Sequence, residues 1–143
     1  MKSIDKGFTL VELMVAMTII GVLLAIAAPS FFEYLAKSKR ADATGVLSET
    51  ATFMERNFAA SGRYDLTEAG AAIVLPLALT TAPRGSASAY YNISFQGAVG
   101  ESTFIVQAIP VNSMDGDACG TLTINQRGQK GVSGSRPVAE CWQ

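Results

Sequence analysis

The sequence lacks histidine altogether and contains only two cysteines among its 143 residues. Histidine is the commonest general base and the commonest metal ligand, so its absence removes the usual starting point for both kinds of site. No nucleophile–base pair of the usual kind can be assembled without it, and the sequence contains no glycine-rich phosphate-binding loop. We therefore expect a protein that is not an enzyme and that uses no cofactor or metal ion.

An excess of either charge is also missing. The chain carries 11 Lys and Arg residues against 12 Asp and Glu residues, a formal net charge of −1. Bulk electrostatics therefore predict no particular partner. The length suits a single domain, because roughly 110 residues remain for a core once an amino-terminal apolar run is set aside.

Residues 8–32 form that apolar run, and they carry a single charge, Glu12. At about 1.5 Å per residue, a helix of this length can cross the hydrocarbon core of a bilayer. A plain transmembrane anchor and a secretory signal peptide, cleaved near residues 25–27, are two ordinary interpretations. Neither explains Glu12, because a carboxylate in lipid is costly and is expected to have a partner.

The position of Glu12 suggests which group that partner is. If the chain is cut after Gly7, Phe8 acquires an α-amino group, and Phe8 and Glu12 lie one helical turn apart. A cationic terminus near Glu12 lowers the cost of burying its charge, either within one subunit or between two.

Residues 6–13, KGFTLVEL, together with the apolar run, resemble the prepilin motif of the type IV pilin family. The resemblance implies that a membrane aspartyl protease, the prepilin peptidase, cuts after Gly7 and methylates the new amine of Phe8. It also implies that Glu12 pairs with the amine of a neighbouring subunit during filament assembly.

The same resemblance sets expectations for the domains and for localisation. We expect a cleaved leader of residues 1–7, a transmembrane and filament-core helix of residues 8–32, and a globular pilin domain of residues 33–143. The chain is expected to enter the inner membrane with that domain in the periplasm, and then to join an extracellular pilus. The basic residues at positions 37–40 favour the opposite orientation on a simple positive-inside count, but the leader motif and the cysteines outweigh it.

Gly21 and Pro29 interrupt the apolar run. In the pilin family this stretch can lose helicity on assembly, so a helix break or flexible region is expected between the two residues. Helical periodicity then resumes and predicts one apolar face, as far as a stop at Ser61–Gly62.

Alternation of apolar and polar residues predicts strands at residues 90–95, 104–109 and 121–126. Residues 62–89 are expected to form a connecting loop with little regular structure. The predicted fold is α+β, the pilin fold: a long amino-terminal helix packed on a small antiparallel sheet of about three to four strands, with a disulfide-bounded carboxy-terminal loop.

Cys119 and Cys141 enclose 21 residues near the end of the chain. A zinc site would need more ligands, and a thioredoxin-like motif would need closer spacing. In an exported chain this pair predicts a disulfide, worth about 3 kcal/mol in the chain-entropy model. Pilins carry a similar loop, and the pattern CGTLTINQ followed by CW is most similar to PilE-like minor pilins of the type IVa system.

The enclosed loop carries Arg127, Lys130 and Arg136 against Glu140. These charges belong either to a solvated loop or to a DNA contact that acts through phosphate neutralisation. DNA is therefore a possible partner besides the other pilins, the prepilin peptidase and the inner membrane.

Tyr90, Tyr91 and Trp142 are candidates for stacking on nucleobases, although packing is the commoner role of such residues. Asp115 and Asp117 flank a glycine, but two carboxylates are too few for the six to eight oxygen ligands of calcium. Neither feature alters the expectation that the chain binds no metal ion.

The leading hypothesis is a structural and assembly role as a minor pilin of a type IV pilus, which supports motility, adhesion or DNA uptake. Two alternatives remain. One is a binding pilin whose exposed domain captures DNA in natural competence, and the other is a pseudopilin of a type II secretion system. The disulfide-bounded loop counts modestly against the pseudopilin.

Overall fold

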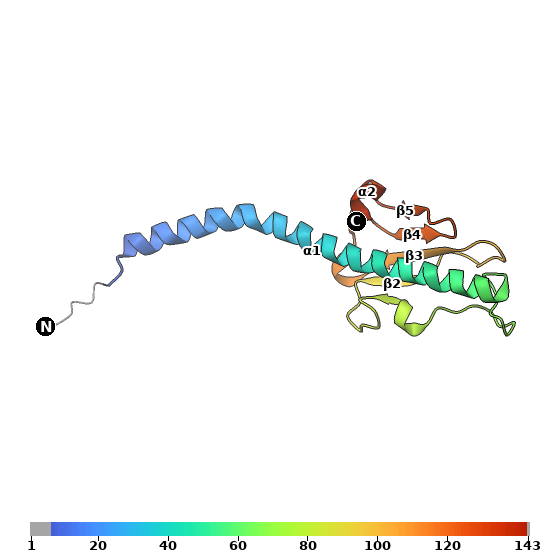
Figure 1. The fold of residues 1–143 in the computed structure, drawn as a ribbon. Coiled ribbons are helices and arrows are strands. Elements are labelled where there is room, and N and C mark those ends of the chain that lie inside the picture. Colours follow the sequence, from blue (N-terminus) through green and yellow to red (C-terminus); the bar gives the residue numbers. More distant parts are fainter. Residues whose placement is uncertain (1–6, 143) are drawn as a thin grey trace. The chain divides into compact units, whose positions relative to one another are not determined.

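The computed structural model describes residues 7–142, and the chain divides into two compact units, one up to Leu35 and one from Ala36 onward (Figure 1). Residues 1–6, most of the expected leader, lie outside the described part. The helix α1 (Leu10–Ser61) contributes residues to both units.

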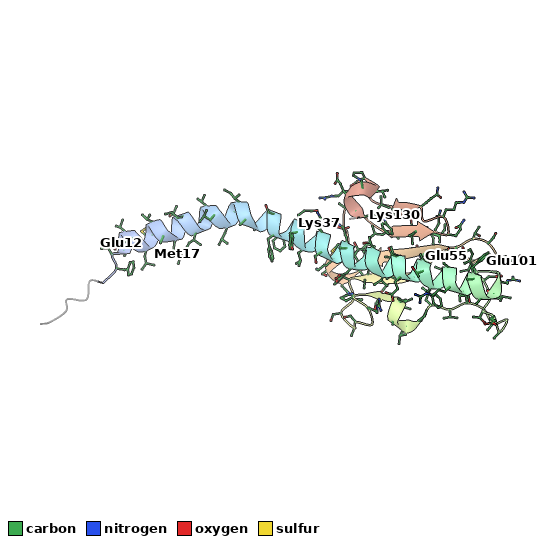
Figure 2. The ribbon with its side chains drawn as sticks, viewed as in Figure 1. Glu12, Met17, Lys37, Glu55, Glu101 and Lys130 are labelled. Atoms are coloured by element: carbon green, nitrogen blue, oxygen red, sulfur yellow. A yellow bond between two sulfur atoms is a disulfide. The ribbon has the colours of Figure 1, made fainter. Side chains whose placement is uncertain are left out.

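In the first unit, α1 presents its apolar side chains outward, as Figure 2 shows around Glu12 and Met17. Every residue from Gly7 to Leu35 whose burial is described is exposed, and Ile26, for example, keeps 70% of its surface. Within residues 7–142, α1 is the one helix that is long and apolar enough to cross a membrane, with a mean hydropathy of 2.5 over its most apolar window. No described residue of this unit covers the helix, so its apolar surface requires lipid or another chain.

The single chain does not show the helix break that was predicted between Gly21 and Pro29. The helix runs unbroken through Gly21 and Pro29. Proline removes one backbone hydrogen bond and glycine costs about 1 kcal/mol relative to alanine, and the many other hydrogen bonds of a 52-residue helix hold the conformation. A local opening on assembly remains a prediction.

In the second unit, α1 is amphipathic and buries one face. Ala43, Val46, Leu47 and Met54 recur at helical spacing and are almost wholly buried. The helix ends at Ser61, where Gly62 takes a positive φ of 72° and donates its N–H to the Phe58 carbonyl at 2.8 Å. The predicted stop is therefore confirmed, because a left-handed glycine ends the helical ladder.

A five-stranded antiparallel sheet with the strand order β1-β2-β3-β4-β5 lies against this part of α1 (Figure 1). The three predicted strands are confirmed to within about a residue, and the sheet has two more short strands at its edges. Strands of two and three residues are too short for an alternating pattern to show in the sequence. The strands are β1 (Thr81–Ala82), β2 (Tyr91–Phe95), β3 (Ile105–Pro110), β4 (Leu122–Asn125) and β5 (Lys130–Val132).

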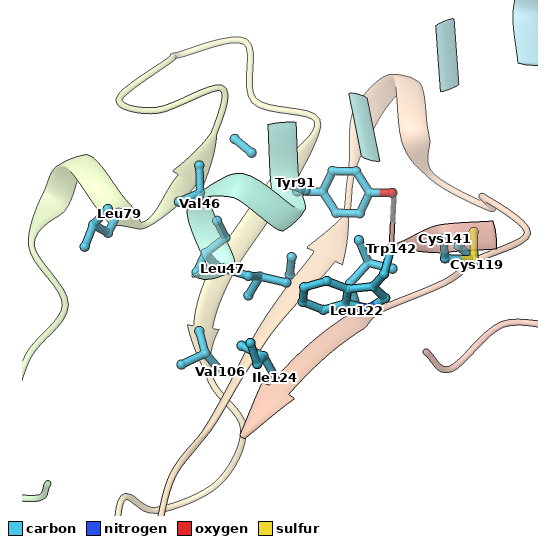
Figure 3. Packing of buried hydrophobic residues seen from close by; sticks show 14 of the residues in the cluster. Val46, Leu47, Leu79, Tyr91, Val106, Cys119, Leu122, Ile124, Cys141 and Trp142 are labelled. Carbon is cyan, nitrogen blue, oxygen red and sulfur yellow. A yellow bond between two sulfur atoms is a disulfide. The ribbon is translucent and has the colours of Figure 1, made fainter. Parts of the chain in front are cut away.

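The two faces of the sheet differ in chemistry. Apolar residues of the inner face pack on Val46 and Leu47 of α1, and Figure 3 shows Tyr91, Val106 and Leu122 among them. On the opposite face the strands align one polar row, because Ser94 pairs with Gln107, Gln107 with Thr123, and Thr123 with Gly131. The outer face therefore presents hydroxyl and amide groups.

Residues 62–89 form mostly irregular structure, as predicted, with a short 3₁₀ helix, η1 (Leu77–Leu79). Tyr64 fixes the start of this connection, since its ring packs between Phe58 and Phe104 with centroid distances of 4.5 and 4.8 Å. Two further short helices follow β3 and β5, namely η2 (Asn112–Met114) and α2 (Val138–Cys141).

Candidate functional sites at the amino terminus and in the disulfide-bounded region

The peptide bond between Gly7 and Phe8 lies outside α1 in exposed, non-helical chain. Phe8 keeps 85% of its surface exposed. A protease must bind its substrate backbone in extended form, so this position is compatible with cleavage. Whether the chain is cut and methylated here stays a prediction.

Glu12 contacts Thr9 through a set of hydrogen bonds that the sequence analysis did not predict. The backbone N–H and the hydroxyl of Thr9 both donate to Oε2 of Glu12 at 2.9 Å, and the Glu12 N–H donates to the Thr9 hydroxyl at 3.2 Å. This reciprocal pattern is a capping box, and its sequence signature, T-x-x-E, is visible at residues 9–12. In the single chain the carboxylate therefore has hydrogen-bond partners, and its pairing with a neighbour's amine remains a prediction.

The predicted disulfide between Cys119 and Cys141 is confirmed. It ties the loop after η2 to helix α2, and Trp142 follows directly, with its indole N–H donating to the Gly131 carbonyl at 3.1 Å. The covalent link therefore holds the carboxy-terminal helix beside β5, the edge strand of the sheet.

The enclosed segment is also held by its own backbone. Gly134 and Ser135 donate their N–H groups to the Cys119 and Ala118 carbonyls at 3.0 and 2.9 Å. An added methyl group at Gly134 would lie 2.1 Å from the Ala118 carbonyl oxygen, so only glycine fits there. The segment is therefore an ordered part of the domain rather than a loop held only by the disulfide.

A buried ion pair joins α1 to this region. Arg40 binds Asp117 with both Nε and Nη2, at 3.0 and 2.5 Å, and both side chains are about 95% buried. Asp117 also accepts the N–H of Cys119 at 3.2 Å and the hydroxyl of Tyr91 at 3.5 Å. Burial alone would raise the pKa of Asp117, but the hydrogen bonds and the charge of Arg40 outweigh it and hold that pKa below its usual range.

This pair shows where two charged residues noted in the sequence lie. Arg40 belongs to the core and not to an exposed basic cluster after the apolar run. Asp117 serves Arg40, and residues 7–142 contain no group of three histidine, cysteine or carboxylate side chains arranged to hold a metal ion.

The aromatic residues considered for base stacking are packing residues. Tyr91 is fully buried, and Trp142 is 9% exposed, with the Lys130 ammonium 5.1 Å from its ring centroid. Tyr90 donates its hydroxyl to Asp42, and Lys39 lies 5.6 Å from the Tyr90 ring centroid. Burial and the Asp42 carboxylate raise the pKa of Tyr90, so it stays neutral at physiological pH.

Arg127 lies at the tip of the turn between β4 and β5. The Gly128 N–H closes the turn on the Asn125 carbonyl at 2.9 Å, and Gly128 has a positive φ of 69°. The Asn125 side-chain oxygen accepts the N–H groups of Arg127 and Gln129 at 2.9 and 3.0 Å. Asn125 therefore holds the backbone of the turn at Arg127, whose side chain is exposed, a role that asparagine commonly takes in turns.

The three predicted cations differ in their place along β5 and in their exposure. Arg127 precedes β5, and Lys130, labelled in Figure 2, begins it. Arg136 follows the other end of that strand and lies 4.0 Å from Glu140. Arg127 and Lys130 are exposed, whereas Arg136 is half-buried, so the first two are the stronger candidates for contact with an anionic partner.

A long, outwardly apolar helix, a meander sheet on its amphipathic part and a disulfide-bounded end define the class of the pilins. A family model described as "Type IV minor pilin ComP, DNA uptake sequence receptor" matches residues 29–123, about two thirds of the chain. The chain belongs to this family. A second model, the prokaryotic N-terminal methylation motif, matches residues 2–28 and includes the Gly7–Phe8 bond and Glu12. The family to which the chain belongs consists of structural pilins and not of enzymes.

Individual proteins are similar to this chain over parts of its length. The type IV major fimbrial protein FimA of Dichelobacter nodosus is 52% identical over 50 residues, which are 35% of this chain and 30% of FimA. The non-core minor pilin PilV of Neisseria meningitidis has the same fold, with a TM-score of 0.51, 20% identity, and coverage of 73% of this chain and 92% of PilV. A type IV pilin from Shewanella oneidensis aligns with a TM-score of 0.49 and 24% identity, over 76% of this chain and 98% of that pilin.

Proposed function

We propose that this pilus subunit is a minor pilin, processed at Gly7–Phe8, held in the inner membrane by the first part of α1 and polymerised through that helix. One observation carries the proposal: every residue from Gly7 to Leu35 whose burial is described is exposed. Between residues 8 and 32, Glu12 is the single charge. Lipid covers such a surface before assembly, and the same helix of neighbouring subunits covers it in a filament.

In this proposal, Glu12 sets the position of one subunit relative to the next in the filament. In the unassembled chain its carboxylate is occupied by Thr9. In a filament, a neighbour's methylated Phe8 amine supplies the opposite charge that a carboxylate needs in a low-dielectric helix bundle.

Mass spectrometry of sheared, purified pili tests this proposal. We expect peptides of this chain at a small fraction of the amount of the major subunit, with an amino terminus at N-methylated Phe8. A terminus near Pro29 would show a conventional signal peptide, and a processed chain that never leaves the membrane would exclude a filament subunit.

The second candidate function is DNA binding during uptake. Two observations favour it: the family model describes a DNA uptake sequence receptor, and the β4–β5 turn presents Arg127 and Lys130 at the surface. Phosphate neutralisation by a few such cations gives binding that weakens as salt concentration rises.

A salt titration of duplex binding by the full chain in zwitterionic nanodiscs tests this function. Arg127→Gln should reduce affinity for every sequence and lower the slope of log affinity against log salt by about 1. Arg56→Gln is the matched control, because Arg56 is exposed on α1 and is not part of the turn. Absence of binding at low salt would exclude DNA as a partner.

A further inference from the structure

The outer face of the sheet contains two shallow hollows, and the first of them adjoins the β4–β5 turn. The first has a volume of about 280 Å³ and lies where the β2–β3 loop meets that turn, lined by Gln96, Thr103, Asn125 and Gln126 among others. The second also has a volume of about 280 Å³ and is lined by Gln96, Gln107, Thr121, Thr123 and Ser133 among others. Because Gln96 lines both hollows, their amide and hydroxyl side chains lie on adjoining parts of one face, which we call the polar surface.

Amide and hydroxyl side chains line both hollows beside apolar ones, which are Ala98, Phe104 and Ile105 in the first and Val132 in the second. Neither lining contains a charged residue. Gln107 donates its side-chain N–H to the Ser94 hydroxyl at 3.2 Å, which fixes the amide across two strands. A methyl group at Gly131 would lie 2.5 Å from the Thr123 hydroxyl, so the glycine leaves the space that this hydroxyl occupies. The surface is therefore ordered and presents both donors and acceptors.

Cations lie beside this neutral surface rather than within it. Arg127 follows Gln126 directly in the chain, so the tip of the turn borders the first hollow. Asn125 takes part in both features, since it lines that hollow and holds the backbone of Arg127. This combination separates two tasks of DNA recognition: cations hold phosphates, and neutral amides and hydroxyls match the donors and acceptors of base edges.

We propose that this polar surface reads the base edges of duplex DNA that the β4–β5 turn holds by its phosphates. The proposal rests on the DNA-binding function proposed above and adds its specificity-determining residues. Gln96 and Gln126 are the principal candidates, because each belongs to the first hollow and glutamine can form two hydrogen bonds with adenine. Their side chains lie at the surface and not in the core.

The test is a selection from a pool of duplexes with a randomised central segment, bound by the full chain in zwitterionic nanodiscs. The wild type should enrich a defined set of sequences. Gln96→Ala combined with Gln126→Ala should reduce the preference for that set over the starting pool by about fivefold or more, with affinity for the pool changed less than twofold. Asn92→Ala is the matched control, because Asn92 is an exposed amide of β2 outside both hollows and should leave the preference unchanged.

The outcomes separate this inference from the function on which it depends. If the wild type binds the pool without preference, or the double variant keeps the preference, the proposal that the polar surface reads base edges is wrong. The proposed DNA-binding function is unaffected by that result. If the wild type binds no duplex at low salt, the DNA-binding function fails and the inference fails with it. Thermal unfolding of each variant verifies its fold, and Gln107→Ala provides a second test within the other hollow.

Discussion

The two parts of α1 have similar local structure and different surroundings. As far as Leu35, the described side chains are exposed and mostly apolar, whereas from Ala36 to Ser61 one face is buried against the sheet. A continuous helix can therefore hold two kinds of apolar surface. The second is covered by the same chain, and the first needs lipid or other subunits.

This difference implies that the first part of α1 serves membrane insertion and assembly, whereas the second part serves folding. Substitutions in the first part should alter membrane residence or filament entry and leave the stability of the globular unit unchanged. Substitutions in the second unit should alter its stability and reach the filament only through the amount of folded protein. The following predictions test this separation, from the largest expected effect to the smallest.

Glu12→Ala should give a chain that is processed and inserted in the membrane but almost absent from sheared filaments. The substitution removes the proposed partner of a neighbour's amine, while the cleavage site at Gly7–Phe8 is unchanged. Quantitative immunoblots of membranes and of sheared pili measure the two pools. Glu68→Ala, an exposed carboxylate of the second unit, is the control. Normal filament content in Glu12→Ala would show that this residue does not direct assembly.

Asp117→Ala should lower the free energy of unfolding of the second unit by about 3–5 kcal/mol, because it removes one member of a buried ion pair and keeps the other. Urea titration followed by the fluorescence of Trp142, the only tryptophan, measures the loss. Asp65→Ala breaks a more exposed pair with Arg63 and should have a much smaller effect. Equal effects of the two substitutions would show that burial of the ion pair is not important.

Cys119→Ser should lower the free energy of unfolding by about 3 kcal/mol, because the disulfide closes a loop of 21 residues. The backbone hydrogen bonds of Gly134 and Ser135 should retain part of the local order. Urea titration of the full chain in nanodiscs and limited proteolysis measure the two effects. A Cys119→Ser chain with wild-type stability would show that these hydrogen bonds hold the region by themselves.

The stability of the second unit should fall as pH drops through the acid range. The pKa of Asp117 is lower in the folded chain than in the unfolded chain, where it is about 3.9. The unfolded chain therefore binds a proton first, and the contribution of Asp117, complete above pH of about 4, is lost as pH falls through the native pKa. Unfolding measured between neutral and acid pH should show a shallower dependence in Asp117→Asn. Identical profiles would assign the dependence to other carboxylates.

Local sequence patterns determined much of this protein. The apolar run with its single charge, the stop at Ser61–Gly62 and the three longer strands are all visible in residues close together along the chain. The capping box at Thr9 and Glu12 is also local, and the T-x-x-E spacing contains the signal. These features follow from helical and strand periodicity and from turn chemistry, which depend on neighbouring residues.

Only the tertiary structure decided which charges are available at the surface. Arg40 and Asp117 are 77 positions apart and resemble solvent-exposed residues in the sequence, yet they form a buried pair. Arg127 and Arg136 are nine positions apart and are separated by a strand. A fold brings distant residues together and gives neighbouring residues different exposure, and the cost of burying a charge depends on those contacts. Local sequence therefore specified the helix and the longer strands, whereas three-dimensional packing selected the residues that remain free to bind a partner.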